Sequence, residues 1–135
     1  MRLILLTLAA AMAATPALAA DPVALKATLA GTSDTDTDGS GSAAVTVDTT
    51  KNEVCYKLTV SNIDPATMAH IHKGAAGVSG PVVVPFDPPT GGSSEGCKPV
   101  TAEVSAAIAA TPGDYYVNVH NATFPKGAIR GQLTK

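Results

Sequence analysis

Three histidines are the residues of this chain best suited to chemistry. His70 and His72 stand two positions apart, and His120 ends the run of residues 115–120. Side chains two apart in an extended chain point to the same side, so the first two histidines can present their imidazoles together. Imidazole is the commonest side-chain ligand for metals in proteins. The pattern therefore makes metal binding the first hypothesis.

The faces of the two histidine segments support this hypothesis. In residues 68–72 and 115–120, small or branched apolar residues alternate with the histidines, which occupy the opposite face. The histidine faces also carry Met68, Asn118 and Tyr116. Directly opposed side chains on neighbouring antiparallel strands have Cβ atoms about 4.5–5.5 Å apart. If the two strands are neighbours, we expect the three imidazoles to meet on one ion, on faces turned away from the core.

Ligand chemistry narrows the choice of metal. Three neutral imidazoles favour copper or zinc, and a thioether ligand favours copper, especially in its reduced state. We therefore predict one copper ion per chain, Cu(I) or Cu(II). Its predicted ligands are His70, His72 and His120, with Met68 as a candidate fourth ligand.

Two neighbours of the histidines have expected supporting roles. Asn118 could orient a ligand imidazole by accepting its free N–H, and Tyr116 could shield the site from solvent. The alternative interpretation is that the histidines are ordinary polar surface residues and that Met68 only packs against its neighbours. Both interpretations stay open from the residues alone.

The rest of the chain predicts an all-β domain that positions these residues. Period-two patterns and β-branched runs indicate strands at residues 23–29, 43–48, 53–62, 68–72, 81–86, 115–120 and 128–134. One helix is expected over residues 101–110, with Thr101 as its N-cap. Residues 88–94 are predicted as a loop. Short, closely spaced strands with one short helix predict an antiparallel, Greek-key-like β-sandwich or barrel.

Residues 1–19 have the pattern of a secretory signal peptide. Arg2 precedes an apolar run, and residues 17–19 fit the small-x-small cleavage pattern. Residues 20–135 are then expected to form a single domain, periplasmic or secreted. Without Arg2, eight basic and eleven acidic side chains give a net charge of −3, which argues against nucleic acid as a partner. No later run of about 18 apolar residues exists, so no membrane anchor is expected.

Cys55 and Cys97 are the two cysteines of the chain. An exported compartment is oxidising and favours a disulfide between them. The alternative is that their thiolates bind a metal.

Four segments resemble the CHRD (chordin-like) domain: AHIHKG at residues 69–74, GVSGPVV at 77–83, YVNVH at 116–120 and GAIRGQL at 127–133. The resemblance covers nearly all of residues 20–135. It implies an extracytoplasmic β-rich domain of the kind found in bacterial exported proteins and in animal chordin, which binds growth factors.

The three histidines also look like the copper ligands of Cu/Zn superoxide dismutase. That enzyme is a β-sandwich whose copper is held by a His-x-His strand and a later histidine. This chain has no further histidine to bridge to zinc or to form a zinc site. The resemblance therefore implies a mononuclear copper site.

The sequence thus predicts an exported copper-binding protein that acts in copper holding, transfer or tolerance. Its mononuclear site has three histidine ligands, either alone or together with the methionine. Another copper-handling protein is a candidate partner. Two alternatives stay open: a metal-free extracytoplasmic interaction or matrix domain, and a superoxide-dismutase-like copper enzyme. No catalytic residue is predicted, and the sequence leaves the oligomeric state open.

Overall fold

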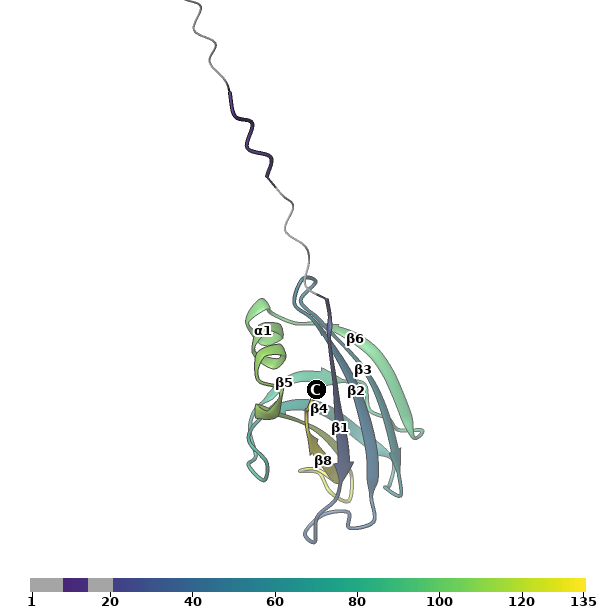
Figure 1. Cartoon of the computed structure of the whole chain (residues 1–135). Helices are drawn as coiled ribbons and strands as arrows, with labels where there is room; N and C mark the ends of the chain where they lie inside the picture. Colours follow the sequence, from purple (N-terminus) through teal and green to yellow (C-terminus); the bar gives the residue numbers. More distant parts are fainter. Residues whose placement is uncertain (1–8, 15–20) are drawn as a thin grey trace, which may run out of the picture.

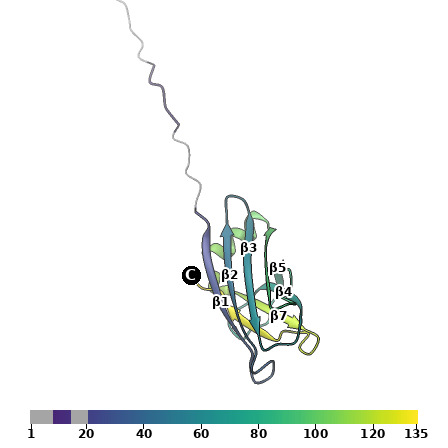
Figure 2. The ribbon, with the colours of Figure 1, turned by 90° about the vertical axis from the view of Figure 1, so that its right-hand side faces the viewer.

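Eight strands form one antiparallel sheet, which confirms the predicted all-β fold. The computed structural model describes residues 9–14 and 21–135. The strands follow the order β5-β4-β7-β8-β1-β2-β3-β6 across the sheet. The sheet curls until its edge strands β5 and β6 lie near each other, so the fold is a near-barrel (Figure 1, Figure 2). The strands are β1 (Val23–Ala30), β2 (Ser40–Asp48), β3 (Glu53–Ser61), β4 (Ala66–Lys73), β5 (Val82–Phe86), β6 (Ser93–Pro99), β7 (Tyr115–Asn121) and β8 (Ile129–Gln132).

The hydrophobic core fills the inside of the curled sheet. Strand β3 shows how period-two sequence builds it: Val54, Tyr56 and Leu58 are buried, while Lys57 and Thr59 point to solvent. An antiparallel sheet with one face on the core produces this alternation. The same alternation buries Ala69 and Ile71 of β4, so the apolar face predicted for residues 68–72 is confirmed as a core face.

The one α-helix among the described residues, α1 (Ala102–Ala110), begins where the sequence predicts it. The Thr101 side chain accepts a hydrogen bond from the backbone N–H of Val104 at 3.2 Å, which satisfies one of the free donors of the first turn. Ile108 is fully buried in the core. The helix is followed by a short 3-10 turn, η1 (Pro112–Asp114).

Strand β6 departs from the prediction, because part of it was expected to be loop. The prediction of a loop over residues 88–94 is wrong at its end, since β6 begins at Ser93. This strand lacks apolar alternation, because its less exposed positions are Ser94, Gly96 and Lys98. Gly96 lies over the ring of Tyr56, where an added Cβ would lie 3.0 Å from the phenol oxygen. Cys97 stands directly opposite Cys55 of β3, and the predicted disulfide between them is confirmed.

The two edge strands are joined through Asp87, the residue after β5. Its backbone N–H donates to the Tyr56 hydroxyl at 2.9 Å, and its carbonyl accepts from the Ser94 hydroxyl at 2.8 Å. Its carboxylate pairs with the Lys98 ammonium at 2.9 Å. Side chains, in place of a backbone ladder, therefore draw β5 toward β6.

The signal peptide predicted for residues 1–19 lies mainly on residues 1–8 and 15–20, outside the described residues, and stays a prediction. Within the described ranges, no helix has the length and apolar character needed to cross a membrane.

Candidate metal centre

Strands β4 and β7 are direct neighbours, as the metal hypothesis required. Their register places Met68 opposite His120, His70 opposite Asn118, and His72 opposite Tyr116. Opposed side chains in an antiparallel pair share one face of the sheet. One ring nitrogen from each of the three histidines lies within 4.8 Å of those of the other two. The structure thus brings the three predicted imidazole ligands together.

Backbone carbonyls determine which ring nitrogen of two histidines is free. Nδ1–H of His72 donates to the carbonyl of Gly80 at 2.9 Å, and Nδ1–H of His120 donates to the carbonyl of Pro125 at 3.0 Å. A carbonyl can only accept, so each neutral ring carries its proton on Nδ1 and its lone pair on Nε2. Nε2 of His72 is buried and has no hydrogen-bond partner among the described residues.

His70 completes the cluster through its Nδ1, which lies 3.2 Å from Nε2 of His120. Because that Nε2 carries a lone pair, Nδ1–H of His70 is the donor in the metal-free protein. To bind a metal through Nδ1, the neutral His70 ring would carry its proton on Nε2 instead. The 3.2 Å separation is close to that of two nitrogens each about 2.0–2.1 Å from one metal ion in tetrahedral geometry. The donor set that fits a metal is therefore Nδ1 of His70 with Nε2 of His72 and of His120.

Burial favours the neutral form of two of these imidazoles by lowering the pKa of His70 and of His120. It lowers the pKa of His70, and the neighbouring His120 and His72 lower it further. Burial also lowers the pKa of His120, with His72 adding to the effect and the bond to Pro125 opposing it. Neutral imidazole is the form that binds a metal, so the lowered pKa values of His70 and His120 favour metal binding.

We expect the metal-free protein to lose stability as the pH falls below about 6.5, the ordinary histidine pKa. His70 and His120 have lowered pKa values in the folded state. Between the folded and unfolded pKa values the unfolded chain binds more protons, so the free energy of unfolding falls as the pH falls. Above the unfolded pKa this loss is absent.

Urea unfolding of the metal-free protein between about pH 8 and pH 5 measures this dependence. The double variant His70→Asn/His120→Asn is expected to have a flatter profile than the parent. If the free energy of unfolding depends on pH with the same slope in both proteins, the attribution of this dependence to His70 and His120 is wrong.

The histidines lie on the face of the sheet opposite the core, and most of this face is nevertheless buried. His72 is 8% exposed and His120 6% exposed, and every residue of β7 is buried. Two loops cover this face, residues 74–81 after β4 and residues 122–128 after β7. His70 alone of the three is only half-buried. A metal ion would therefore enter from the His70 side.

Arg130 and Gln132 of β8 fix the first of these loops. The Arg130 guanidinium donates to the carbonyls of Val78 at 3.1 Å and Ala75 at 3.2 Å. The Gln132 amide donates to the carbonyl of Gly74 at 3.0 Å. These bonds hold residues 74–80 in the position that brings the Gly80 carbonyl to His72.

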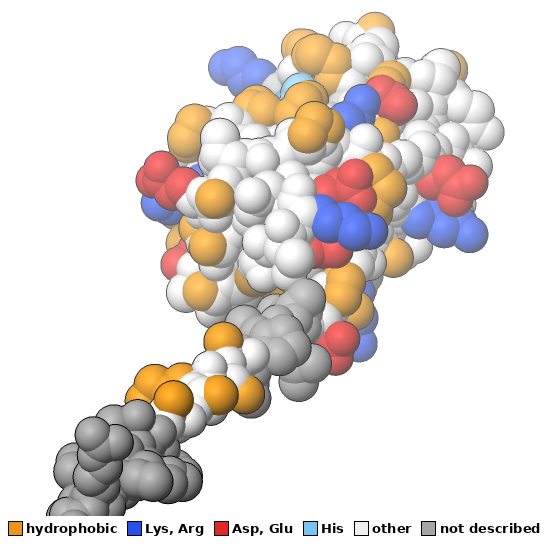
Figure 3. Space-filling model, turned by 90° about the horizontal axis from the view of Figure 1, so that it is seen from above, with side chains coloured by type: hydrophobic (Ala, Val, Ile, Leu, Met, Phe, Trp, Pro, Cys, Tyr) orange, Lys and Arg blue, Asp and Glu red, His pale blue; other side chains and the backbone are white. Residues whose placement is uncertain are grey.

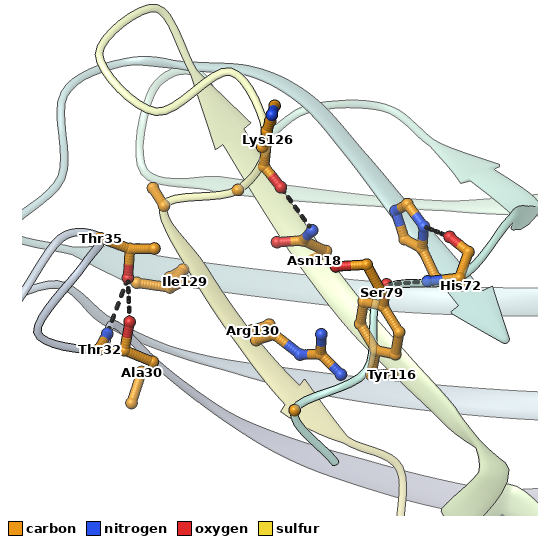
Figure 4. A pocket seen from close by; sticks show the side chains of 14 residues that line it. Ala30, Thr32, Thr35, His72, Ser79, Tyr116, Asn118, Lys126, Ile129 and Arg130 are labelled. Carbon is orange, nitrogen blue, oxygen red and sulfur yellow. Dashed lines mark hydrogen bonds between the residues drawn. The ribbon is translucent and has the colours of Figure 1, made fainter. Parts of the chain in front are cut away.

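Tyr116 lies between His72 and Arg130 (Figure 4). Its ring stacks on the His72 ring, with centroids 4.9 Å apart and an angle of 6°, and the Arg130 guanidinium lies 3.4 Å from its centroid. Its hydroxyl accepts a hydrogen bond from the backbone N–H of Gly80 at 3.0 Å. Tyr116 covers one side of His72, consistent with its expected shielding role.

Asn118 acts on the second loop. Its amide nitrogen donates to the carbonyl of Lys126 at 3.3 Å. Gly127 allows the close approach, because its φ is +132° and an added Cβ would lie 2.4 Å from the Asn118 amide oxygen. The structure therefore gives the predicted Asn118 role, acceptance of an imidazole N–H, to the carbonyls of Gly80 and Pro125.

Met68 lies on the rim of the cluster. It is 47% exposed and stands opposite His120, so its ligation stays a prediction. Val82 opposite His72 and Pro85 opposite His70 are exposed too. Seen from above, the visible histidine surface is bordered by hydrophobic side chains (Figure 3). The exposed part of His70 therefore lies beside apolar side chains of β4 and β5.

A second group of possible ligands lies at Glu53, Cys55 and Cys97, whose ligand atoms also fall within 4.8 Å of one another. Both sulfurs are joined in the disulfide. The alternative of a thiolate metal site therefore does not hold for the oxidised protein.

A comparison with known protein families gives one match. The family model described as the CHRD domain matches residues 25–133, from β1 to just beyond β8. The chain belongs to the CHRD domain family. The segments that resemble this family contain His70, His72 and His120, and also Gly80 and Arg130. Domains of this CHRD family are extracellular, and the disulfide agrees with such a location.

No curated protein and no solved structure matches this CHRD chain. The looser resemblance to Cu/Zn superoxide dismutase is thus not supported by any comparison.

Sequence reasoning did not single out the residues that orient the imidazoles in this CHRD domain. Gly80 and Pro125 act through backbone carbonyls, and Gln132 through an amide directed at a loop. Glycine-rich turns beside both histidine strands were the available signal, because glycine permits close backbone approach.

Proposed function

We propose that this CHRD domain is a copper-binding protein that holds one ion through His70, His72 and His120. The observation that carries the proposal is Nε2 of His72, a buried lone pair without a partner among the described residues, beside two further imidazole nitrogens. Leaving a buried acceptor unsatisfied costs about 1–3 kcal/mol. A bound cation would satisfy it.

The donor chemistry supports copper. The cluster consists of three imidazoles, and the thioether of Met68 stands on the same face of the sheet. Imidazole with thioether suits copper in both oxidation states. The carbonyl bonds to Nδ1 of His72 and His120 orient the rings and raise their basicity, as outer partners of metal ligands do.

The partial exposure of the site supports a role in copper holding, transfer or tolerance. His70 is the most exposed of the three ligands, and its exposed part lies beside apolar side chains of β4 and β5 that include Met68. We propose a periplasmic or secreted location and another copper-handling protein as the partner that receives the ion at the exposed part of His70.

A metal-free interaction domain is the second candidate. The hydrogen bond of 3.2 Å between His70 and His120 supports it, because this bond joins two of the imidazoles without an ion. The two candidates differ in a measurable way, since only the first requires stoichiometric metal.

Titration with Cu(I) and Cu(II), each against a competing chelator, tests the proposal. The parent protein is expected to bind one equivalent, and His70→Ala and His120→Ala to bind at least about 100-fold more weakly, because each removes one ligand. Lys57→Ala, at an exposed site on β3, is the matched control and should bind like the parent. If both histidine variants bind as tightly as the parent, the site is wrong. If the parent itself binds no stoichiometric copper, the metal-free candidate is favoured.

Met68→Leu separates a site of three histidines from one in which the methionine is a fourth ligand. A thioether ligand favours Cu(I), so its loss is expected to weaken Cu(I) binding more than Cu(II) binding. Equal affinities in the variant and the parent would leave a site of three histidines alone.

A further inference from the structure

A pocket of about 480 Å³ lies beside the metal centre, on the outer face of β7 and β8 (Figure 4). Tyr116, Asn118 and Arg130 project into it from these two strands. Its other walls come from three loops, with lining residues in 32–35, 77–80 and 126–128. A volume of this size falls in the range of small-molecule sites.

The pocket is in contact with the parts that orient the imidazoles. His72 is itself one of its lining residues. Gly80, whose carbonyl accepts from His72, lines one wall. Lys126, which follows the Pro125 carbonyl that accepts from His120, lines another. A molecule in the pocket would therefore touch both loops that orient the His72 and His120 rings.

The charges that line the pocket have one sign. Arg130 and Lys126 contribute cations, and the lining contains no aspartate or glutamate among the described residues, although the whole chain has a net charge of −2. A concave site lined by one sign of charge concentrates its field on an oppositely charged ligand.

Some hydrogen-bond donors of the pocket residues are available to a ligand. The Arg130 guanidinium makes three hydrogen bonds, to Ala75, Val78 and Gln132, and has five N–H groups. Lys126 and Ser79 also line the pocket and are exposed, and the described residues offer no hydrogen-bond partner to the Lys126 ammonium or the Ser79 hydroxyl. These groups can therefore take an added acceptor without breaking a bond of the fold.

The remainder of the lining is largely apolar and includes Ala30, Ala128 and Ile129. This combination suits a ligand with an apolar body and a negatively charged end.

We propose that this pocket binds a small organic carboxylate, attracted by the positive charges of Arg130 and Lys126 on either side of Asn118 (Figure 4), with its apolar body against Ala30 and Ile129. The binding itself is independent of any metal. Because His72 and Gly80 line the pocket, the occupant also alters the metal centre; this second part rests on the proposed copper function.

Titration of the metal-free full chain with benzoate tests the binding. Benzamide, which has nearly the same shape and no charge, is the control ligand. We expect saturable binding of one benzoate, binding of benzamide at least about tenfold weaker, and a loss of about tenfold in benzoate affinity for Lys126→Gln, because this substitution removes one of the two positive charges that attract the carboxylate. Lys57→Gln, outside the pocket, should bind benzoate like the parent. The proposal is overturned by equal binding of benzoate and benzamide, by a Lys126→Gln variant equal to the parent, or by no saturable binding.

Benzoate added to the Cu(II)-loaded protein tests the link to the metal centre. The visible absorption of Cu(II) is expected to shift in the parent and to shift much less, at the same benzoate concentration, in Lys126→Gln. A shift of equal size in both proteins would mean that benzoate reaches the metal from the His70 side, which overturns the link. If the chain binds no copper, the proposed function fails, while the titration of the metal-free protein still decides the pocket.

Discussion

Gly80→Ala is expected to destabilise the fold and to weaken copper binding at the same time. An added Cβ at Gly80 would lie 1.6 Å from the carbonyl oxygen of Lys73 on β4. A backbone oxygen cannot move aside as a side-chain end can, so the loop of residues 74–81 must shift. We expect a loss of about 3 kcal/mol in the free energy of unfolding, as for a severe overpacking.

The effect on copper follows from the same shift. The Gly80 carbonyl is the acceptor for Nδ1–H of His72, and loss of such an outer partner typically lowers metal affinity about 10–100-fold. Urea unfolding and competitive copper titration measure the two effects separately.

Gly113→Ala is the matched control, because a Cβ there meets nothing within 4 Å and the residue lies outside this loop. It should resemble the parent in both measurements. A Gly80→Ala protein with parental copper affinity would contradict the proposed role of this carbonyl.

Loss of the disulfide is expected to lower the stability of the fold while leaving the metal centre intact. Cys55 and Cys97 are 42 residues apart, and closing a loop of that length stabilises a protein by about 4 kcal/mol in the chain-entropy model. The bridge joins β3 to β6, whereas the histidines lie on β4 and β7.

The Cys55→Ser/Cys97→Ser double variant should therefore unfold at a lower urea concentration than the parent and still bind copper with parental affinity. A dithiol reductant should destabilise the parent by a similar amount and leave the variant unchanged. Unfolding of the oxidised parent and the variant at the same urea concentration would show that the bridge adds no stability.

Local sequence determined most of the secondary structure and the faces of the strands. The alternation in β3 and the Thr101 cap of α1 depend on residues a few positions apart, so they can be recognised without the rest of the chain. The sequence did not predict strand β6, because its own residues have no apolar alternation. Its position depends on pairing with β3 and on contact with the ring of Tyr56.

The histidine site was likewise determined partly by the local sequence and partly by the tertiary structure. The sequence alone determined that His70, His72 and His120 lie on the faces opposite the apolar residues of their strands. Only the tertiary structure decided that these faces meet, because His70 and His120 are 50 positions apart and strand pairing at that distance leaves no local pattern.

The protonated nitrogen and the burial of the His72 and His120 rings were also determined by the tertiary structure. The carbonyls of Gly80 and Pro125 place the proton of each ring on Nδ1, and the loops that carry them bury His72 and His120. Every residue has a backbone carbonyl, so its presence in the sequence carries no signal. Its position depends on distant contacts, such as those of Arg130 with the first loop and of Asn118 with the second, and only the folded chain brings these together.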